Sequence, residues 1–246
     1  MYIVERFLSI QGEGKYAGKT AYFLRTAGCN FRCPGFGVEK EVKGRLIVGC
    51  DTIRAVYVNE FANTYEDFSP KVYEKELEAL PYKPLVIITG GEPLLHYKNE
   101  QFYSFIKALL DKGYEVHFES NGSIFLDFSS FPLYKNCVFA LGVKLSNSGM
   151  QEDLRISKTA LENIIKNAKD YFLKFVLNKD ENINKEVFKI QKLLNISAEN
   201  IFCMPLGASK TELEENANYV FDFCLKHGFS YTDRLHIRLF NDKEGI

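Results

Sequence analysis

The stretch Leu85-Val86-Ile87-Ile88-Thr89-Gly90-Gly91-Glu92-Pro93 decides the fold of this chain. Its first five residues are apolar or β-branched without interruption, which is typical of a strand buried on both faces of a parallel sheet. Two glycines follow at once, and glycine lets a backbone turn sharply where it approaches a ligand. The stretch therefore predicts a buried strand with a ligand site at its carboxyl end.

Outward from this strand, short apolar runs alternate with longer amphipathic ones. The apolar runs predict six further strands, at Thr20–Arg25, Glu115–Ser120, Val138–Lys144, Tyr171–Leu177, Ile201–Met204 and Leu235–Leu239. Helical patterns lie between them, near 71–80, 99–113, 158–169, 184–195 and 210–227. This alternation predicts an α/β fold of right-handed βαβ units, a partial, open parallel β/α barrel of about six strands. In such folds the chemistry lies beyond the carboxyl ends of the strands.

The composition is that of an ordinary globular protein. A chain of 246 residues suits one domain, 1–246, and 46% hydrophobic residues are enough to bury a core. The net charge of −1 argues against a nucleic-acid or membrane-surface protein. The N-terminus does not resemble a signal peptide, and no apolar run reaches the roughly 18 residues of a membrane span. We therefore expect a cytoplasmic protein.

Three of the six cysteines form a motif, Cys29-x3-Cys33 followed after sixteen residues by Cys50. In a reducing cytosol, clustered cysteines indicate a metal or redox site rather than disulfides. Three thiolates can bind three irons of a [4Fe–4S] cluster and leave the fourth iron open to another ligand. A zinc site is the alternative. The other cysteines, Cys137, Cys203 and Cys224, lie singly in apolar segments and are interpreted as core residues.

The cysteine motif and Gly90-Gly91-Glu92-Pro93 together resemble the radical S-adenosylmethionine enzymes, and the predicted barrel is of their type. The resemblance implies that Cys29, Cys33 and Cys50 hold a [4Fe–4S] cluster, and that S-adenosylmethionine occupies the open iron. It also implies that Gly90, Gly91 and Glu92 bind the methionyl amino group. The usual second spacing is two residues, so residues 34–49 are interpreted as an inserted loop.

A narrower resemblance begins at Phe7-Leu8-Ser9-Ile10-Gln11-Gly12-Glu13-Gly14 and extends through Cys50-Asp51-Thr52 to Arg234-Leu235-His236. These segments are similar to the 7-carboxy-7-deazaguanine synthase family of queuosine and 7-deazapurine biosynthesis. The family reaction implied is radical ring contraction of 6-carboxy-5,6,7,8-tetrahydropterin to 7-carboxy-7-deazaguanine, with loss of ammonia. S-adenosylmethionine is regenerated and Mg²⁺ is required. This makes the chain a carbon–nitrogen lyase whose product leads to tRNA modification.

The resemblance also implies a set of substrate residues. An arginine at a strand end suits a carboxylate, because its guanidinium binds one through two hydrogen bonds. A glutamate suits the two neighbouring N–H donors of a 2-amino-4-oxo ring. The set is Gln11, Gly12, Glu13, Arg25, Thr89 and His236. Each also has an ordinary structural interpretation, such as a surface ion pair for the arginine or a satisfied core residue for the histidine.

The remaining candidates concern Mg²⁺ and the cofactor. The resemblance makes Thr52 the Mg²⁺ candidate, because in this family the Thr two residues after the last cluster cysteine binds that ion, which prefers oxygen ligands. Thr is equally suited to be a helix N-cap. Polar residues after the later strands are candidates for binding S-adenosylmethionine, namely Ser120, Asn121, Lys144 and Ser146. Gly142-Val143 departs from the family pattern, in which Ser-Pro often precedes this lysine.

The family further implies a flavodoxin or ferredoxin as reductant and a homodimer. Two alternatives remain open at this point. One is another small radical enzyme, such as a glycyl-radical activase, which shares the cysteines and Gly-Gly-Glu-Pro but acts on a protein. The other is a non-catalytic, zinc-stabilised binding module.

Overall fold

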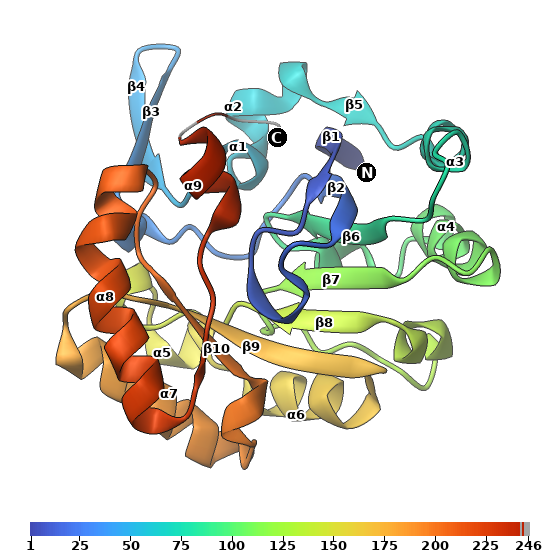
Figure 1. Ribbon diagram of the computed structural model, residues 1–246. Helices are drawn as coiled ribbons and strands as arrows, with labels where there is room; N and C mark the ends of the chain where they lie inside the picture. Colours follow the sequence, from blue (N-terminus) through green and yellow to red (C-terminus); the bar gives the residue numbers. More distant parts are fainter. Residues whose placement is uncertain (242, 244–246) are drawn as a thin grey trace.

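A curved, mostly parallel sheet forms the centre of the molecule (Figure 1). The structure is a computed structural model that describes residues 1–241 and 243, so residues 242 and 244–246 of the predicted 1–246 domain lie outside the described residues. Over the described residues the sheet order is β11-β10-β9-β8-β7-β6-β2-β1-β5. The strands are β1 Tyr2–Ile10, β2 Thr20–Thr26, β5 Glu66–Asp67, β6 Leu85–Gly90, β7 Val116–Ser120, β8 Val138–Leu141, β9 Asp170–Leu177, β10 Ile201–Pro205 and β11 Ser230–Tyr231.

The parallel part of this sheet is the predicted partial barrel. Strands β2, β6, β7, β8, β9 and β10 pair in parallel and correspond to six of the predicted strands. Strand β8 ends at Leu141, three residues earlier than predicted. Strand β6 is buried along its whole length, as its apolar sequence predicts. The register places Arg25 beside Thr89, so both lie at the carboxyl ends of neighbouring strands.

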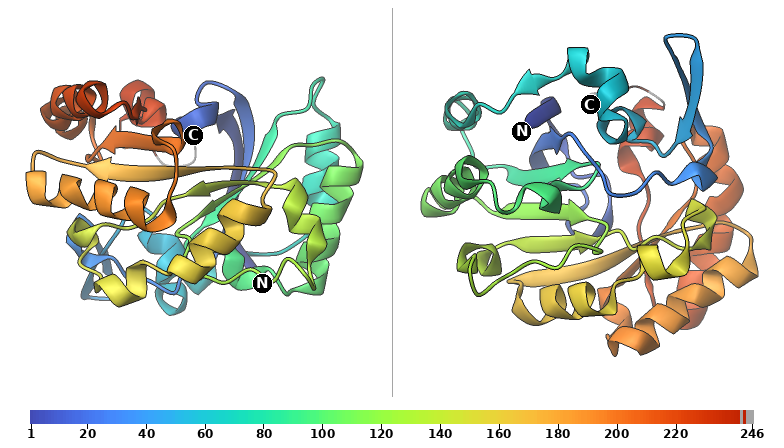
Figure 2. Two further views of the ribbon diagram at one scale, coloured as in Figure 1. Left: turned by 90° about the horizontal axis from the view of Figure 1, so that it is seen from below. Right: turned by 180° about the vertical axis from the view of Figure 1, so that it is seen from behind.

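Amphipathic helices cover the outside of the curved sheet, as the two further views in Figure 2 show. Helix α4 begins after Asn99, whose side chain accepts from Phe102 N, and buries Phe102, Phe105, Ile106 and Leu109 on one face. None of the helices in the described chain has the length and apolar character needed to cross a bilayer. The helices are α1 Ile53–Val56, α2 Val58–Phe61, α3 Pro70–Glu78, α4 Glu100–Asp111, α5 Glu152–Arg155, α6 Lys158–Asn167, α7 Glu181–Leu194, α8 Lys210–His227 and α9 Leu235–Phe240.

The prediction of a strand at Leu235–Leu239 is wrong, because this segment forms helix α9. Its apolar–polar alternation over five residues fits a strand, but a run this short also fits a helical turn. Ile237 is buried and Leu239 is half-exposed. The segment returns across the open side of the barrel, where Leu235 N donates to Gly12 O over 3.1 Å.

Strand β1 and a hairpin in the insertion are among the elements that the sequence analysis did not predict. Strand β1 pairs antiparallel with β2 and extends the sheet beyond the parallel strands. The inserted segment 34–49, expected to be a loop, contains the antiparallel hairpin of β3 Val38–Val42 and β4 Arg45–Gly49. Lys43 and Gly44 form its tight turn with positive φ angles of 52° and 73°. Figure 1 shows this hairpin standing out from the body of the molecule.

Candidate active site

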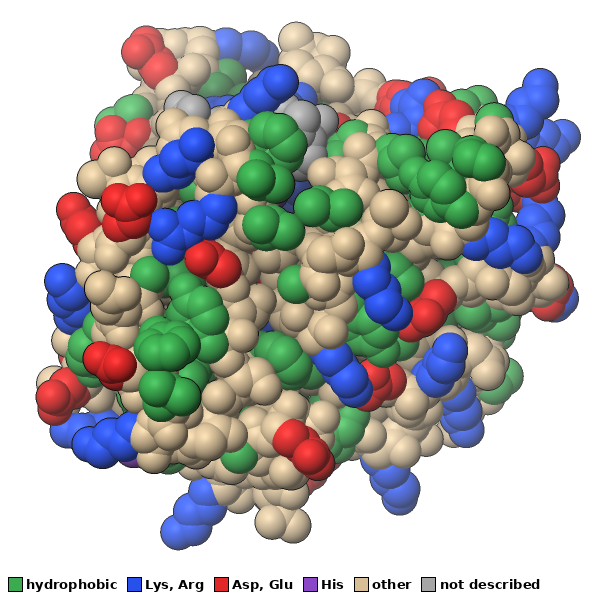
Figure 3. Space-filling model, viewed as in Figure 1, with side chains coloured by type: hydrophobic (Ala, Val, Ile, Leu, Met, Phe, Trp, Pro, Cys, Tyr) green, Lys and Arg blue, Asp and Glu red, His purple; other side chains and the backbone are tan. Residues whose placement is uncertain are grey.

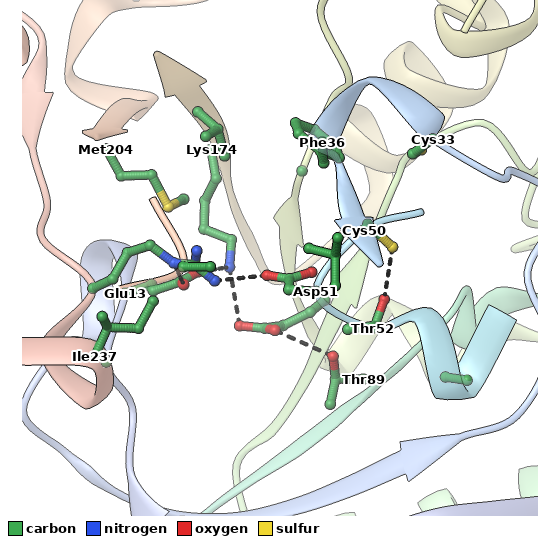
Figure 4. A pocket seen from close by; sticks show the side chains of 18 of the residues that line it. Glu13, Cys33, Phe36, Cys50, Asp51, Thr52, Thr89, Lys174, Met204 and Ile237 are labelled. Atoms are coloured by element: carbon green, nitrogen blue, oxygen red, sulfur yellow. Dashed lines mark hydrogen bonds and ion pairs between the residues drawn. The ribbon is translucent and has the colours of Figure 1, made fainter. Parts of the chain in front are cut away.

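A cavity of about 820 Å³ opens at the carboxyl ends of the parallel strands. Figure 4 shows Glu13 and Lys174 on one side of it and Cys33, Cys50 and Thr52 on the other. Two predicted residues do not line it: Glu92 lies buried behind the wall, and Ser146 is exposed. The predicted residues that do line it are Gln11, Gly12, Glu13, Arg25, Cys29, Cys33, Cys50, Thr52, Thr89, Gly90, Gly91, Ser120, Asn121, Lys144 and His236.

The three motif cysteines occupy one end of the cavity. Cys29 follows strand β2, Cys33 directly precedes the insertion and has a positive φ of 45°, and Cys50 follows strand β4. Phe31 N donates to Cys29 Sγ over 3.3 Å, and Thr52 Oγ1 lies 3.2 Å from Cys50 Sγ. Burial raises the pKa of Cys29 to about 12 and that of Cys33 to about 11, so both thiols are neutral at pH 7.

This donor set fits a cluster bound by three thiolates. Within the described chain, no three His, Cys, Asp or Glu side chains are arranged to bind one metal ion. In a [4Fe–4S] cluster each cysteine binds a different iron, so the sulfurs are spread around a larger body than a single ion. The three thiols line one cavity and lie near enough to influence one another's pKa, which is the arrangement that such a cluster requires.

Glu92 lies beside the cysteines and has no side-chain solvent exposure. Its carboxylate accepts from Leu94 N (2.9 Å), Ser120 Oγ (2.9 Å) and Asn121 N (2.7 Å). Burial outweighs these hydrogen bonds and raises the pKa of Glu92 to about 7. No Lys or Arg of the described residues forms an ion pair with it, so this carboxylate lacks a cation.

The opposite end of the cavity carries carboxylates that are already paired. Lys174 Nζ lies 2.9 Å from Glu13 Oε2 and 3.1 Å from Glu119 Oε1, and Arg234 Nε lies 3.0 Å from Glu13 Oε1. Burial alone would raise the pKa of Glu13, but the charges of Lys174 and Arg234 hold it well below its usual range. The pKa of Glu119 is also lowered, against the effect of burial, by Lys174.

Neutral and charged groups extend this carboxylate network in two directions. Gln11 Nε2 donates to Glu119 Oε1 over 3.0 Å, and Thr89 Oγ1 donates to Glu119 Oε2 over 3.2 Å. Arg234 Nη2 lies 2.6 Å from Asp51 Oδ2, and Arg234 Nη1 donates to Gly207 O over 2.7 Å. Arg234 thus connects the cysteine loop, the segment after β1 and the segment after β10.

Arg25 and His236 lie at the cavity with different surroundings. Arg25 Nε is 2.7 Å from Glu5 Oε1 on the neighbouring strand β1, so its guanidinium has one carboxylate partner. His236 lies on helix α9 rather than on a strand, and burial lowers the pKa of its imidazole. A Cβ added to Gly12 would lie 2.5 Å from His236 Nδ1, so only glycine permits this approach.

The other candidates have more local roles in the structure. Thr52 is the residue before helix α1, but its hydroxyl contacts Cys50 Sγ and makes no capping hydrogen bond. Asn121 Nδ2 donates to Asn30 Oδ1 over 3.0 Å, which connects the segment after β7 to the cysteine loop. Ser146 directs its backbone N–H to Glu186 over 3.2 Å, away from the cavity.

Four charged residues of the site were not predicted as site residues: Glu5, Glu119, Lys174 and Arg234. One signal for Lys174 was available, since it is a charged residue inside the apolar run Phe172-Leu173-Lys174-Phe175-Val176. A lysine is almost never fully buried unless it is paired. Its partners, however, come from two distant segments, and the sequence does not show which segments meet.

The chain is similar to known proteins in sequence and in fold. A family model described as "4Fe-4S single cluster domain" matches residues 10–165, which include the three motif cysteines. The chain is 29% identical to 7-carboxy-7-deazaguanine synthase of Halobacterium salinarum, over 98% of this chain and 90% of that protein. It is 27% identical to the synthase of Rhodopirellula baltica, over 100% and 88%. The crystal structure of QueE from Escherichia coli has the same fold, with a TM-score of 0.64 at 18% identity, over 96% of this chain and 94% of that one.

Proposed function

The chain belongs to the 4Fe-4S single cluster domain family, and we propose that it acts as a 7-carboxy-7-deazaguanine synthase, a radical S-adenosylmethionine lyase. Its substrate is 6-carboxy-5,6,7,8-tetrahydropterin, which it contracts to 7-carboxy-7-deazaguanine with loss of ammonia. The whole chain forms the single catalytic domain. The bound cluster and S-adenosylmethionine supply the radical that starts this reaction.

One observation carries the proposal: a single cavity has three thiols at one end, with the cation-free carboxylate of Glu92 buried behind the wall there, and a pair of carboxylates with their cations at the other end. The first end suits a cluster with an open iron and a cofactor that carries an ammonium group. The second end suits a polar heterocycle with adjacent N–H donors. Neither a zinc-binding module nor a purely structural protein explains the buried, unpaired Glu92.

The cofactor residues follow from the first end of the cavity. Glu92 binds the methionyl amino group, with Gly90 and Gly91 forming the turn that allows its approach. Ser120 and Asn121 hold Glu92 in place through the hydrogen bonds described above, and Asn121 also fixes the cysteine loop. Lys144 faces the cofactor. The side chain of Ser146 is exposed, so Ser146 takes part only as a member of the loop that carries Lys144.

The substrate residues follow from the second end. Glu13 and Glu119 accept hydrogen bonds from the adjacent N–H groups of the pterin. Gln11 forms hydrogen bonds with a neighbouring polar edge of the ring. Gly12 leaves room for His236 to reach the same space. Arg25 binds the pterin carboxylate. To do so, its guanidinium either leaves Glu5 or contacts both carboxylates at once. Thr89 stands between the two ends. Thr52, with the neighbouring carboxylate of Asp51, supplies oxygen ligands for Mg²⁺.

The partners in the proposal are a flavodoxin or ferredoxin and a second copy of the chain. The reductant must approach the cysteine end, near which the hairpin of β3 and β4 stands. For the homodimer, helix α8 offers an apolar surface: Phe221 and Leu225, one turn apart, are 48% and 70% exposed. Figure 3 shows hydrophobic side chains gathered over this helix. Reduced thiols and an oxygen-sensitive cluster suit a cytoplasmic location.

The experiment is anaerobic reconstitution with iron and sulfide, followed by reductant, S-adenosylmethionine, Mg²⁺ and 6-carboxytetrahydropterin. The expected result is a brown protein that forms 7-carboxy-7-deazaguanine, detected by mass. Cleavage of S-adenosylmethionine without this product would retain the radical class and reject the substrate, leaving a protein-activating enzyme as the alternative. A colourless protein that binds zinc would reject the proposal altogether. Omitting Mg²⁺ tests the requirement for this ion separately.

A further inference from the structure

Two segments that depart from the family pattern lie against each other in the structure. One is the cluster-loop turn, residues 34–37 at the start of the insertion, and the other is the cofactor loop, residues 142–149. A Cβ added to Gly35 would lie 2.2 Å from Asn147 O and 2.7 Å from Gly149 N. The two backbones are therefore in direct contact, at a position where only glycine fits.

The same contact brings an aromatic ring to a lysine. The ring centroid of Phe36 lies 5.6 Å from Lys144 Nζ, within the range in which an ammonium is attracted to an aromatic face. Both residues line the cavity. Figure 4 shows Phe36 on the cysteine side, near Cys33 and across the cavity from Glu13. The insertion thus contributes a side chain to the wall of the site.

Lys144 lacks an anionic partner of its own. Its ammonium makes no hydrogen bond and no ion pair with the residues that the structure describes. Its charge nevertheless acts to lower the pKa of Cys33, Cys50 and Glu92, so it lies within electrostatic range of the cluster and cofactor end. A half-buried ammonium in this position is available to an anionic group of a bound ligand.

The backbone of the cofactor loop is fixed from the opposite side. The buried Arg155 donates from Nη1 to Lys144 O over 2.9 Å and pairs with Glu186 over 2.8 Å. Glu186 also accepts from Ser146 N over 3.2 Å. Because these contacts fix the main chain without Phe36, the ring determines mainly where the flexible side chain of Lys144 points.

We infer that Phe36 is a positioning residue, whose ring directs the Lys144 ammonium to the carboxylate of bound S-adenosylmethionine. The inference rests on the proposed function. It gives the start of the insertion a specific role: this turn supplies an aromatic contact to a loop in which the usual Ser-Pro is replaced by Gly142-Val143. The hairpin tip has no part in this role.

The test measures S-adenosylmethionine binding rather than turnover. The full chain is reconstituted, its cluster is reduced, and the cofactor is titrated while the electron paramagnetic resonance signal is followed. We expect Phe36→Leu to weaken binding about 5-fold, because leucine keeps the apolar bulk and loses the aromatic face. Phe36→Tyr, which keeps that face, should stay within about twofold of the unaltered protein. Leu46→Ala, at an exposed position of the same insertion, is the control and should change nothing.

A second measurement separates positioning from general damage to the loop. Lys144→Met should weaken binding more than Phe36→Leu, and Phe36→Leu should add nothing in the Lys144→Met background. Unchanged affinity of Phe36→Leu at equal iron content, in a protein that makes the deazaguanine, would overturn this inference alone. Additive effects of the two substitutions would overturn it as well. An unaltered protein that does not bind S-adenosylmethionine would overturn the proposed function and this inference together.

Discussion

The two ends of the cavity handle buried carboxylates in opposite ways. Glu13 and Glu119 are paired with Lys174 and Arg234, and both have a lowered pKa. Glu92 is more deeply buried than either, has three hydrogen-bond donors but no cation, and has a pKa raised to about 7. The same side-chain type thus has its pKa shifted in opposite directions, according to its burial and its partners.

The difference indicates which end awaits a charged ligand. A buried carboxylate without a cation destabilises the folded chain when it ionises, and a ligand ammonium removes that cost. The end that carries Glu13 and Glu119, here called the paired end, requires no such ligand and is suited to neutral hydrogen-bond donors of a substrate. The end beside Glu92 is called the unpaired end. The predictions below test this contrast, from the largest expected effect on the free energy of unfolding to the smallest.

Removing the central cation of the paired end should have the largest effect. Lys174→Met leaves Glu13 and Glu119 buried side by side without the ammonium between them. We expect the free energy of unfolding at pH 7.5 to fall by about 3–5 kcal/mol, the cost of breaking a buried ion pair from one side. Urea denaturation of the iron-free, reduced protein measures it.

The control for this prediction is another Lys–carboxylate contact of similar length. Lys15 Nζ lies 2.7 Å from Asp170 Oδ2, but the lysine is 41% exposed. Lys15→Met should cost less than about 1 kcal/mol, because solvent screens an exposed pair. Equal losses for the two substitutions would show that burial does not distinguish the paired end.

At the unpaired end, Glu92→Gln should change how stability depends on pH. The pKa of Glu92 rises from 4.5, its ordinary value, to about 7 on folding. The folded state therefore holds this proton more tightly, and its contribution to stability is present below pH 4.5 and lost as pH rises through 7. Relative to Glu92→Gln, the unaltered protein should lose about 3 kcal/mol between pH 4.5 and pH 8.

This measurement compares urea unfolding of the two iron-free proteins at several pH values. The control is Glu41→Gln, at an exposed position of the hairpin. Its free energy of unfolding should depend on pH as that of the unaltered protein does. The contradicting result is a difference in free energy of unfolding between the unaltered protein and Glu92→Gln that does not change with pH. Ionisation of Glu92 would then carry no cost in the folded state, and the contrast between the two ends would be wrong.

Arg234→Lys should have an intermediate effect. The guanidinium contacts Glu13, Asp51 and Gly207 O at once, and a lysine ammonium cannot match this fork. We expect a loss of about 2 kcal/mol, typical of a hydrogen bond to a charged group, by urea unfolding. Arg238→Lys, at the more exposed pair with Asp233, is the matched control with a smaller expected loss. A larger loss for the control would exclude Arg234 as the main connection among the three loops.

The strands and the cysteine end could be predicted from the sequence because both follow local rules. Strands buried on two faces are apolar throughout, as Leu85–Gly90 shows, and their carboxyl ends collect the residues that come next in the chain. The paired end could not be predicted in the same way. Lys174 and Arg234 meet Glu13 only through the folded chain, and no spacing in the sequence encodes that contact.

For His236, the sequence predicted the place in the molecule but not the secondary structure. It lines the cavity as predicted, but on a helix rather than a strand, because five alternating residues fit both conformations. The hairpin in the insertion was missed for a related reason. Its two strands are short and bury only Ile47 and Gly49, so they lack the long buried apolar run by which strands of a parallel sheet are recognised.

The smallest effect on stability concerns the ion pair of Glu5 and Arg25, which belongs neither to the paired end nor to the unpaired end. Both side chains are about one-fifth exposed and the ion pair is 2.7 Å long. Glu5→Gln should therefore cost less than about 1 kcal/mol of stability. In the proposed function Glu5 competes with a substrate carboxylate for Arg25, so its neutralisation should lower KM for 6-carboxytetrahydropterin and leave kcat unchanged. Glu76→Gln, which neutralises one of the two carboxylate partners of Arg6 away from the cavity, should leave KM unaltered. A higher KM in Glu5→Gln would mean that Glu5 orients Arg25 instead of competing for it, and this pair would then belong with the paired end.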